Sequence, residues 1–193
     1  MKKKFLVFLM ITAICTCSAC GSSSSGTTDT SYVIEDGVYH TGTGYEIELT
    51  DHWTKTDNEN TDLAFLYKDS TNDAFTESLN VIVQDLSDGD TNLESYKEDS
   101  VKQYNDLGYV IDECEQVTIG GKKSYNIISH TENGGTNIYC KQIFSVIDKH
   151  AYVFTFAAEK KDFDKLENEV TASFNSIKYG NYSLEEETSD AAE

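Results

Sequence analysis

Positive charge is scarce in this sequence, which has no arginine, no proline and a single tryptophan in 193 residues. Its 15 lysines face 34 aspartate and glutamate residues, for a formal net charge of −19. No basic patch exists that could release counterions from nucleic acid, so nucleic-acid binding is not expected. The same negative charge repels anionic lipid headgroups and favours cations or basic partners. We find no physical reason for the absence of proline.

Catalytic motifs are also missing. The sequence contains no H-E-x-x-H, G-x-S-x-G or Walker-type pattern. The glycines of G-G-K-K at residues 120–123 are expected to turn a hairpin rather than to cradle a phosphate. The histidines are far apart in sequence, and we interpret them as strand-end or surface residues, with a metal or general-base role as the alternative. These are His40, His52, His130 and His150. We therefore predict a non-enzymatic protein without catalytic, cofactor-binding or metal-binding residues.

The first twenty residues have the order of an export signal. Three lysines precede an apolar run at residues 5–16, and Ser18 and Ala19 are small residues before Cys20. This arrangement resembles a bacterial lipoprotein signal, with Cys17-Ser18-Ala19-Cys20 as its lipobox and Cys20 as the lipidated residue. It departs from the usual pattern at Cys17, where leucine is common. An ordinary secretory signal with incidental cysteines is the alternative.

These features divide the chain into four segments. Residues 1–19 are predicted as the signal peptide, 20–32 as the lipidated cysteine with a Gly/Ser-rich tether, 33–180 as one folded domain, and 181–193 as an acidic disordered tail. Cleavage before Cys20 leaves 12 lysines and 34 acidic residues, a formal charge of −22. No later stretch has the roughly 20 apolar residues that a spanning helix needs. We therefore expect attachment to the outer face of a cell membrane through lipid on Cys20.

Alternating hydrophobicity predicts an α+β domain with a central antiparallel sheet of about six to seven strands. Strands are expected at residues 45–49, where Glu46 and Glu48 lie on a wet face, and at 63–67 and 79–83. Four more strands, joined by short turns, predict a C-terminal meander. Their ranges are 109–119, 124–131, 136–147 and 150–158.

Two amphipathic helices are expected to flank this sheet. The first opens with a capping box of Thr91 and Glu94 and stops at Gly108. Its apolar stripe consists of Leu93, Tyr96, Ser100, Tyr104 and Leu107. The second covers residues 162–177, with a stripe of Phe163, Leu166, Val170, Phe174 and Ile177.

The cysteines outside the leader, Cys114 and Cys140, fall on strands that one further strand separates. Two strand spacings are about 9.6 Å, which exceeds the limit of roughly 7 Å between bridged Cα atoms. We predict two free, mostly buried thiols, with a disulfide as the alternative permitted by an oxidising compartment.

Three stretches are similar to PsbP-like domains. Residues 44–53 (GYEIELTDHW) resemble the opening strand and turn of that family, residues 117–125 (VTIGGKKSY) its strand, glycine turn and strand, and residues 170–177 (VTASFNSI) its last helix. Thr50 stands where the family usually has proline. The resemblance implies a central antiparallel sheet flanked by helices, used as a binding scaffold, and it carries no catalytic residue.

Two further features could carry binding. Acidic and amide side chains around residues 85–94 are expected to form a solvated loop, with a weak calcium site as the alternative. They are Asp85, Asp88, Asp90, Asn92 and Glu94. Trp53 could stack on a ligand, but sealing the end of the core is the expected role.

The sequence thus predicts a lipid-anchored extracytoplasmic accessory module that docks an envelope protein. Exposed aromatics such as Tyr39, Tyr139 and Tyr152, if gathered in one patch, would favour this function. The alternative is a small-ligand or calcium-binding lipoprotein serving a transporter, which a deep pocket beside Trp53 would favour.

Overall fold

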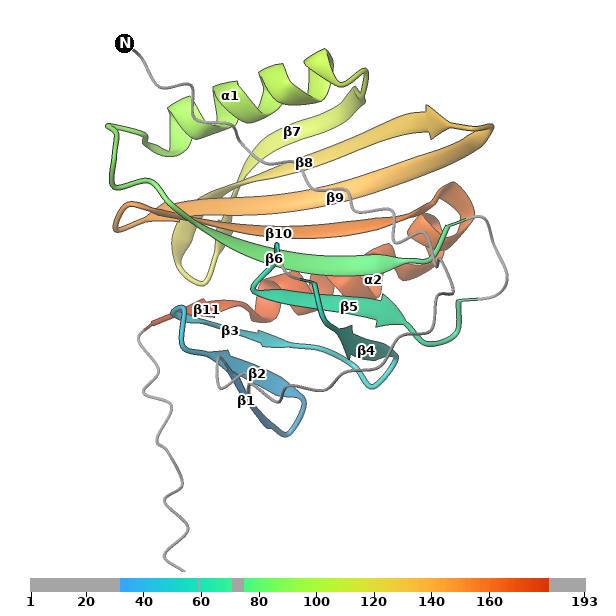
Figure 1. The fold of residues 1–193 in the computed structure, drawn as a ribbon, viewed down its shortest axis with the longest axis horizontal. Helices are drawn as coiled ribbons and strands as arrows, with labels where there is room; N and C mark the ends of the chain where they lie inside the picture. The colour runs from blue at the N-terminus through green and yellow to red at the C-terminus, as the bar shows by residue number, and fades with distance from the viewer. Residues whose placement is uncertain (1–31, 59, 71–74, 181–193) are drawn as a thin grey trace, which may run out of the picture.

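The computed structural model describes residues 32–58, 60–70 and 75–180. The predicted signal peptide (1–19), Cys20, the tether up to residue 31 and the tail (181–193) lie outside these residues. The described chain has an α+β fold of two antiparallel sheets and two helices (Figure 1). No helix in this part is long and apolar enough to cross a membrane.

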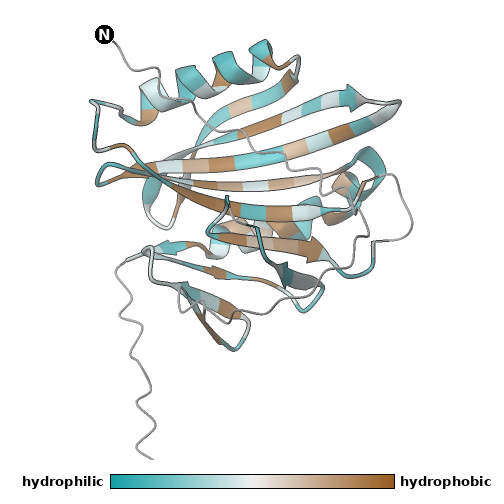
Figure 2. Ribbon diagram, viewed as in Figure 1, coloured by the Kyte–Doolittle hydropathy of each residue, from teal (hydrophilic) through white to brown (hydrophobic). Residues whose placement is uncertain are grey.

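The larger sheet has seven strands in the order β4-β5-β6-β10-β9-β8-β7. They are β4 (Trp53–Thr56), β5 (Leu63–Tyr67), β6 (Ser78–Asp85), β7 (Val110–Ile119), β8 (Lys122–Asn133), β9 (Thr136–Ile147) and β10 (His150–Glu159). Strands β7 to β10 pair successively, so the predicted four-strand meander is confirmed. Hydrophobic and hydrophilic residues alternate along these strands (Figure 2), as expected where side chains point to opposite faces.

A second, smaller sheet has the order β1-β2-β3-β11. It consists of β1 (Tyr32–Glu35), β2 (Val38–Thr41), β3 (Tyr45–Glu48) and β11 (Lys178–Tyr179). The strand predicted at residues 45–49 therefore belongs to this sheet and not to the central one. Its alternation identified a strand but not its partners, because β11 is only two residues long and comes from the far end of the domain.

The two helices, α1 (Leu93–Asp106) and α2 (Lys160–Ser176), cover opposite faces of the larger sheet (Figure 1). On β10, Phe154 packs in the cluster with α2, whereas Val153 packs with Tyr96 and Tyr104 of α1. The small sheet lies on the α2 side, where Tyr45 and Ile47 of β3 join the main core. This core also includes all five residues of the predicted α2 stripe.

The start of α1 differs from the prediction by one residue. Asn92, not Thr91, is the N-cap, and its Oδ1 accepts hydrogen bonds from the backbone N–H groups of Glu94 (3.0 Å) and Ser95 (3.1 Å). Ser95 Oγ accepts from the Asn92 N–H in return, so the capping box is Asn92–Ser95. Asparagine caps at least as well as threonine, which explains the shift.

The end of α1 follows the prediction at Gly108, which has a φ of +81° and directly follows the C-cap. Leu107, however, is exposed rather than part of the buried stripe. It is the C-cap residue, where the helical spacing that aligns the stripe ends.

The two cysteines are free, and the strand β8 lies between them. Cys140 on β9 is fully buried, and burial raises the pKa of its thiol to about 12. Cys114 is exposed, which corrects the prediction that both would be mostly buried. Cys114 lies on β7, the last strand of the larger sheet, and six other residues of that strand are exposed too.

Candidate functional site

The outer face of the small sheet combines carboxylates, one lysine and apolar side chains. Cross-strand partners point to the same face, and the register pairs His40 with Val33 and Glu46, and Val38 with Glu48. Lys178 pairs with Glu46 from β11. Glu35 pairs with Val38 from β1. We call these seven residues the outer face: Val33, Glu35, Val38, His40, Glu46, Glu48 and Lys178.

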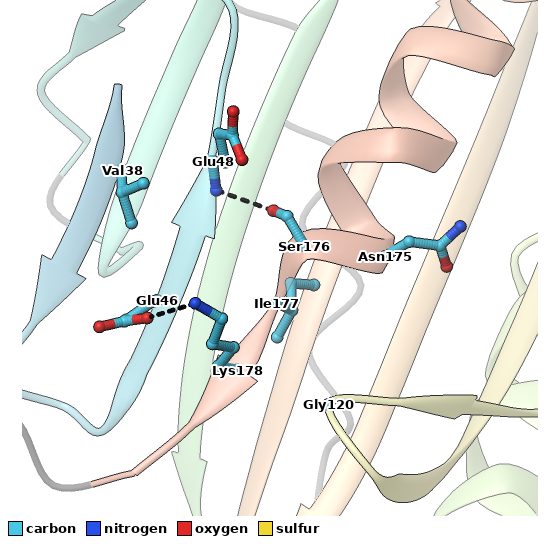
Figure 3. Close-up of a pocket in the computed structure, with 8 residues that line it drawn as sticks. All are labelled: Val38, Glu46, Glu48, Gly120, Asn175, Ser176, Ile177 and Lys178. Carbon is cyan, nitrogen blue, oxygen red and sulfur yellow. Dashed lines mark hydrogen bonds and ion pairs between the residues drawn. The ribbon is translucent and has the colours of Figure 1, made fainter. Parts of the chain in front are cut away.

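Part of this face opens into a pocket of about 370 Å³ at the C-terminal end of α2 (Figure 3). The small sheet supplies one side of the pocket, and the end of α2 with the β7–β8 turn supplies the other. Its lining residues are Val38, Glu46, Glu48, Gly120, Asn175, Ser176, Ile177 and Lys178.

Glu46 lies between the side chains of His40 and Lys178. It is only 7% exposed, and its Oε1 lies 2.6 Å from His40 Nδ1 while its Oε2 lies 3.5 Å from Lys178 Nζ. Burying a carboxylate is costly unless hydrogen bonds or an ion pair compensate for the lost water. The alternation of residues 45–49 predicts Glu46 on a solvent-exposed face. Glu46 does lie on that face of the sheet, but neighbouring side chains bury it.

Glu48, on the same face, is exposed as predicted. Its backbone N–H donates to Ser176 Oγ at 2.9 Å, which ties β3 to the end of α2 (Figure 3). Among the described residues, no cation pairs with the Glu48 carboxylate. A cationic group entering the pocket from outside would therefore meet an unneutralised carboxylate.

The β7–β8 turn closes the pocket through Gly120. A Cβ at this position would lie 2.9 Å from both the Ile177 carbonyl oxygen and the Tyr179 ring, and Gly120 has a φ of +54°. Only glycine fits both conditions. The turn of residues 120–123 is thus a hairpin packed against β11, in agreement with the prediction.

The β1–β2 hairpin forms the margin of the small sheet and projects from one end of the molecule (Figure 1). Asp36 and Gly37 turn it, with φ values of +50° and +83°, as a two-residue type I′ turn requires. In β1, Val33 is 42% exposed and Ile34 is 50% exposed, so both are large hydrophobic side chains in contact with solvent. No described strand pairs with the outer edge of β1.

The predicted histidines do not gather. Each contacts its own local partner: Glu46 for His40, Glu169 for His52, Asp112 for His130 and the Asp148 carbonyl for His150. Within the described ranges, no group of three or more histidine, cysteine or acidic side chains could hold a metal ion.

Three of the five candidate calcium ligands have local structural roles. Asp85 Oδ1 accepts from the Ser87 N–H at 2.7 Å, and this bond lowers the pKa of the Asp85 carboxyl. Asn92 caps α1, and Glu94 Oε1 accepts from the Tyr125 hydroxyl at 2.8 Å. The loop thus uses three of its five candidate ligands for folding.

Trp53 packs in the core, as predicted. It is 4% exposed, its ring makes edge contacts with Tyr67 and Phe156, and its Nε1–H donates to Glu169 Oε1 at 3.0 Å. The pocket does not adjoin it. The three aromatics whose gathering in one patch would favour docking have separate ring partners: Tyr39 packs on Phe65, Tyr139 on Phe163 and Tyr152 on Tyr179.

Sequence reasoning missed the β1 edge and the pocket. The Asp36-Gly37 pair is a strong hairpin signal and could have identified β1 and β2. Lys178 and Ser176 carry no such signal, because they reach β3 only through the tertiary fold.

No protein-family model matches the sequence, and no curated protein matches it. Solved structures with a similar fold include LpqN of Mycobacterium tuberculosis, at 12% identity and a TM-score of 0.58 over 70% of this chain and 83% of that one. Cyanobacterial PsbP (CyanoP) from Synechocystis sp. PCC 6803 shares 16% identity with a TM-score of 0.54, over 82% and 98% of the two chains.

The Ran-binding protein Mog1p of Saccharomyces cerevisiae is a third, at 8% identity and a TM-score of 0.53 over 74% of this chain and 94% of that one. At these identities the likeness concerns the fold alone. The chain therefore has the α+β fold of PsbP-like domains, as the sequence resemblance implied.

Proposed function

We propose that this protein is a lipid-anchored, non-catalytic accessory module at the outer face of a bacterial cell membrane, where it docks an envelope protein. The unpaired, partly apolar β1 edge is the observation that carries the docking role. Such edges are templates for a strand from another chain. The lipobox-like residues ending at Cys20 support the anchor.

Two structural neighbours are consistent with this proposal. LpqN is described as involved in cell envelope biogenesis, and Mog1p is described as Ran-binding. Because one fold hosts many functions, these descriptions support a binding role without naming a partner.

The anchor is tested by replacing Cys20 with alanine and fractionating the cells. We expect the Cys20→Ala protein to leave the membrane fraction, because no other lipid-bearing residue is predicted. Cys17→Ala is the matched control and should stay membrane-bound. Retention of Cys20→Ala at the membrane would refute lipid anchoring.

Docking is tested by crosslinking the anchored protein in living cells and identifying captured proteins by mass spectrometry. One dominant envelope protein, lost when an excess of the unanchored Cys20→Ala chain competes, is the expected result. Capture that the competitor does not reduce would count against a docking module.

Binding of a small cationic ligand is a second candidate, which the pocket of about 370 Å³ with the unpaired Glu48 favours. Calcium and simple alkylamines are suitable probes in thermal unfolding. A concentration-dependent rise in Tm, lost in Glu48→Gln, would support this function.

A further inference from the structure

We propose that the free edge of β1 binds an extended, lysine- or arginine-bearing segment of a membrane protein by strand addition. This inference deepens the docking function proposed above and rests on it for its membrane placement. It names the edge, the backbone groups and the chemistry of the partner.

The register of the hairpin shows which backbone groups are available. Glu35 and Val38 flank the two-residue turn and form the hydrogen-bonded pair that closes it. Hydrogen-bonded and non-hydrogen-bonded pairs alternate in antiparallel ladders, so Ile34, opposite Tyr39, and Tyr32, opposite Thr41, are non-hydrogen-bonded. The N–H and C=O groups of Tyr32 and Ile34 therefore point outward, toward an incoming strand.

Side chains on β1 suit a partner strand as well. Val33 and Ile34 point to opposite faces of the strand, and both are exposed β-branched residues. An added strand thus finds one apolar neighbour on each face. Tyr32, beside them, is partly buried and packs its ring against Tyr39.

The edge strand β7 of the larger sheet has features that oppose strand addition, whereas β1 lacks them at its centre. Strand β7 carries Asp112, Glu113 and Glu115 on the exposed margin of the larger sheet, and its pairing is irregular between Ile111 and Glu113. Charges and bulges on edge strands oppose strand addition. The centre of β1 has two apolar residues and no charge.

The acidic residues near β1 favour a basic partner strand at its edge. Glu35 and Asp36 are exposed at the end of β1, and Glu48 adds a carboxylate without a cationic partner on the same sheet. A second copy of this protein and the acidic residues 181–193 would both bring like charge. Residues 21–31 contain no lysine and no large apolar side chain to match Val33 and Ile34.

The position of β1 in the sequence limits where the partner can be. Only residues 21–31 separate the predicted lipidation site from Tyr32. Eleven residues span at most about 38 Å when fully extended. The basic segment must therefore lie close to the membrane surface, as an extracytoplasmic loop of a membrane protein does.

The test uses the full chain, purified in detergent with its lipid, and two synthetic peptides of equal charge. Acetyl-Lys-Val-Lys-Val-Lys-Val-amide can form a strand, whereas acetyl-Lys-Gly-Lys-Gly-Lys-Gly-amide is a poor strand former. We expect the valine peptide to slow hydrogen exchange at the amides of Tyr32 and Ile34, and the glycine peptide to leave them unchanged.

Two double variants test the charge selection. Glu35→Gln with Asp36→Asn removes two charges while keeping an Asn-Gly turn, and Glu113→Gln with Glu115→Gln removes two charges from β7. The first should weaken binding of the valine peptide about fivefold, on the scale of two exposed ion pairs. The second should change it much less.

Other outcomes overturn the proposal. Equal binding of both peptides would indicate charge attraction alone, and protection at β7, or no binding, would exclude the β1 edge. If the Ile34 amide is protected from hydrogen exchange without any peptide, the edge is occupied by a segment of this chain. If that protection increases with protein concentration, the occupant is a second copy. Peptide binding at β1 with Cys20→Ala retained at the membrane would overturn the anchor and leave the edge site standing.

Discussion

His40 Nδ1 lies 2.6 Å from the buried carboxylate of Glu46, and this contact joins β2 to β3 on the outer face of the small sheet. The pair matters for stability because Glu46 is almost fully covered. Replacing Glu46 with glutamine removes the charge that Lys178 neutralises and changes the group that His40 Nδ1 contacts. We expect the free energy of unfolding to fall by about 1–3 kcal/mol, the cost of disrupting a buried charged hydrogen bond.

Urea unfolding followed by circular dichroism measures this loss. Glu48→Gln on the same strand is the control, because its carboxylate is exposed and has no cationic partner in the described structure. Equal stability of Glu46→Gln and Glu48→Gln would show that the contacts of Glu46 contribute nothing.

Gly120 provides a second prediction. Gly120→Ala places a Cβ 2.9 Å from the Ile177 carbonyl oxygen, a backbone atom that cannot move away cheaply. Gly121→Ala, the control, shares the positive φ (+74°) but meets nothing within 4 Å. Both variants bear backbone strain of about 1 kcal/mol or more, and only Gly120→Ala adds a collision. Thermal unfolding should show the lower Tm for Gly120→Ala; the reverse order would contradict the packing of this turn.

The two thiols should differ in reactivity. Cys114 is exposed, whereas Cys140 is fully buried with its pKa raised to about 12. Because the thiolate is the reactive form, a disulfide reagent at mildly alkaline pH should modify Cys114 of the folded protein quickly and Cys140 only after unfolding. Cys114→Ser should abolish the fast phase. A fast phase that persists in Cys114→Ser would show that Cys140 is accessible.

Stability should also decrease in alkali. Burial raises the pKa of the Cys140 thiol from 9.0 and that of the Tyr179 hydroxyl from 10.0, each to about 12. The contribution of these two protonated groups to the free energy of unfolding is fully present below their ordinary pKa values. It is lost as pH rises toward 12, because the unfolded chain releases these protons at lower pH than the folded one. Between its ordinary and its raised pKa, each group lowers the free energy of unfolding by roughly 1.4 kcal/mol per pH unit.

Urea unfolding between pH 8 and pH 11 measures this dependence. Cys140→Ala should flatten the curve above pH 9, whereas Cys114→Ala should change the slope much less, because Cys114 is exposed and only partly desolvated. An identical slope in the wild type and in Cys140→Ala would contradict the burial of that thiol.

Much of the larger sheet could be predicted from the sequence, because its strands are set by turns and apolar patterns among residues close in sequence. The turns at Gly120-Gly121 and at Gly134-Gly135 force neighbouring strands to pair in order. The stripe of α2 was also readable, since residues three and four apart share one face. At the start of α1, two adjacent residues could both act as caps, so the prediction was wrong by one position.

The small sheet was not predictable in the same way. Its closing strand is Lys178–Tyr179, too short to leave an alternation, and its partners Tyr45 and Glu46 are distant in sequence. The burial of Glu46 depends on Lys178 and on His40, contacts that no local pattern contains. Leu107 is exposed because it lies at the end of α1, and Cys114 is exposed because it lies on the edge strand of the larger sheet. Neither boundary can be recognised from a helical stripe or from an alternation of apolar residues.

The pairing of β11 with β3 also sets an order of events during synthesis. A chain that emerges from its N-terminus presents Tyr45 long before Tyr179 follows. The small sheet and the pocket between Val38 and Lys178 are therefore incomplete until almost the whole domain has been synthesised. A partner that binds the finished sheet would select completed chains over those still being made.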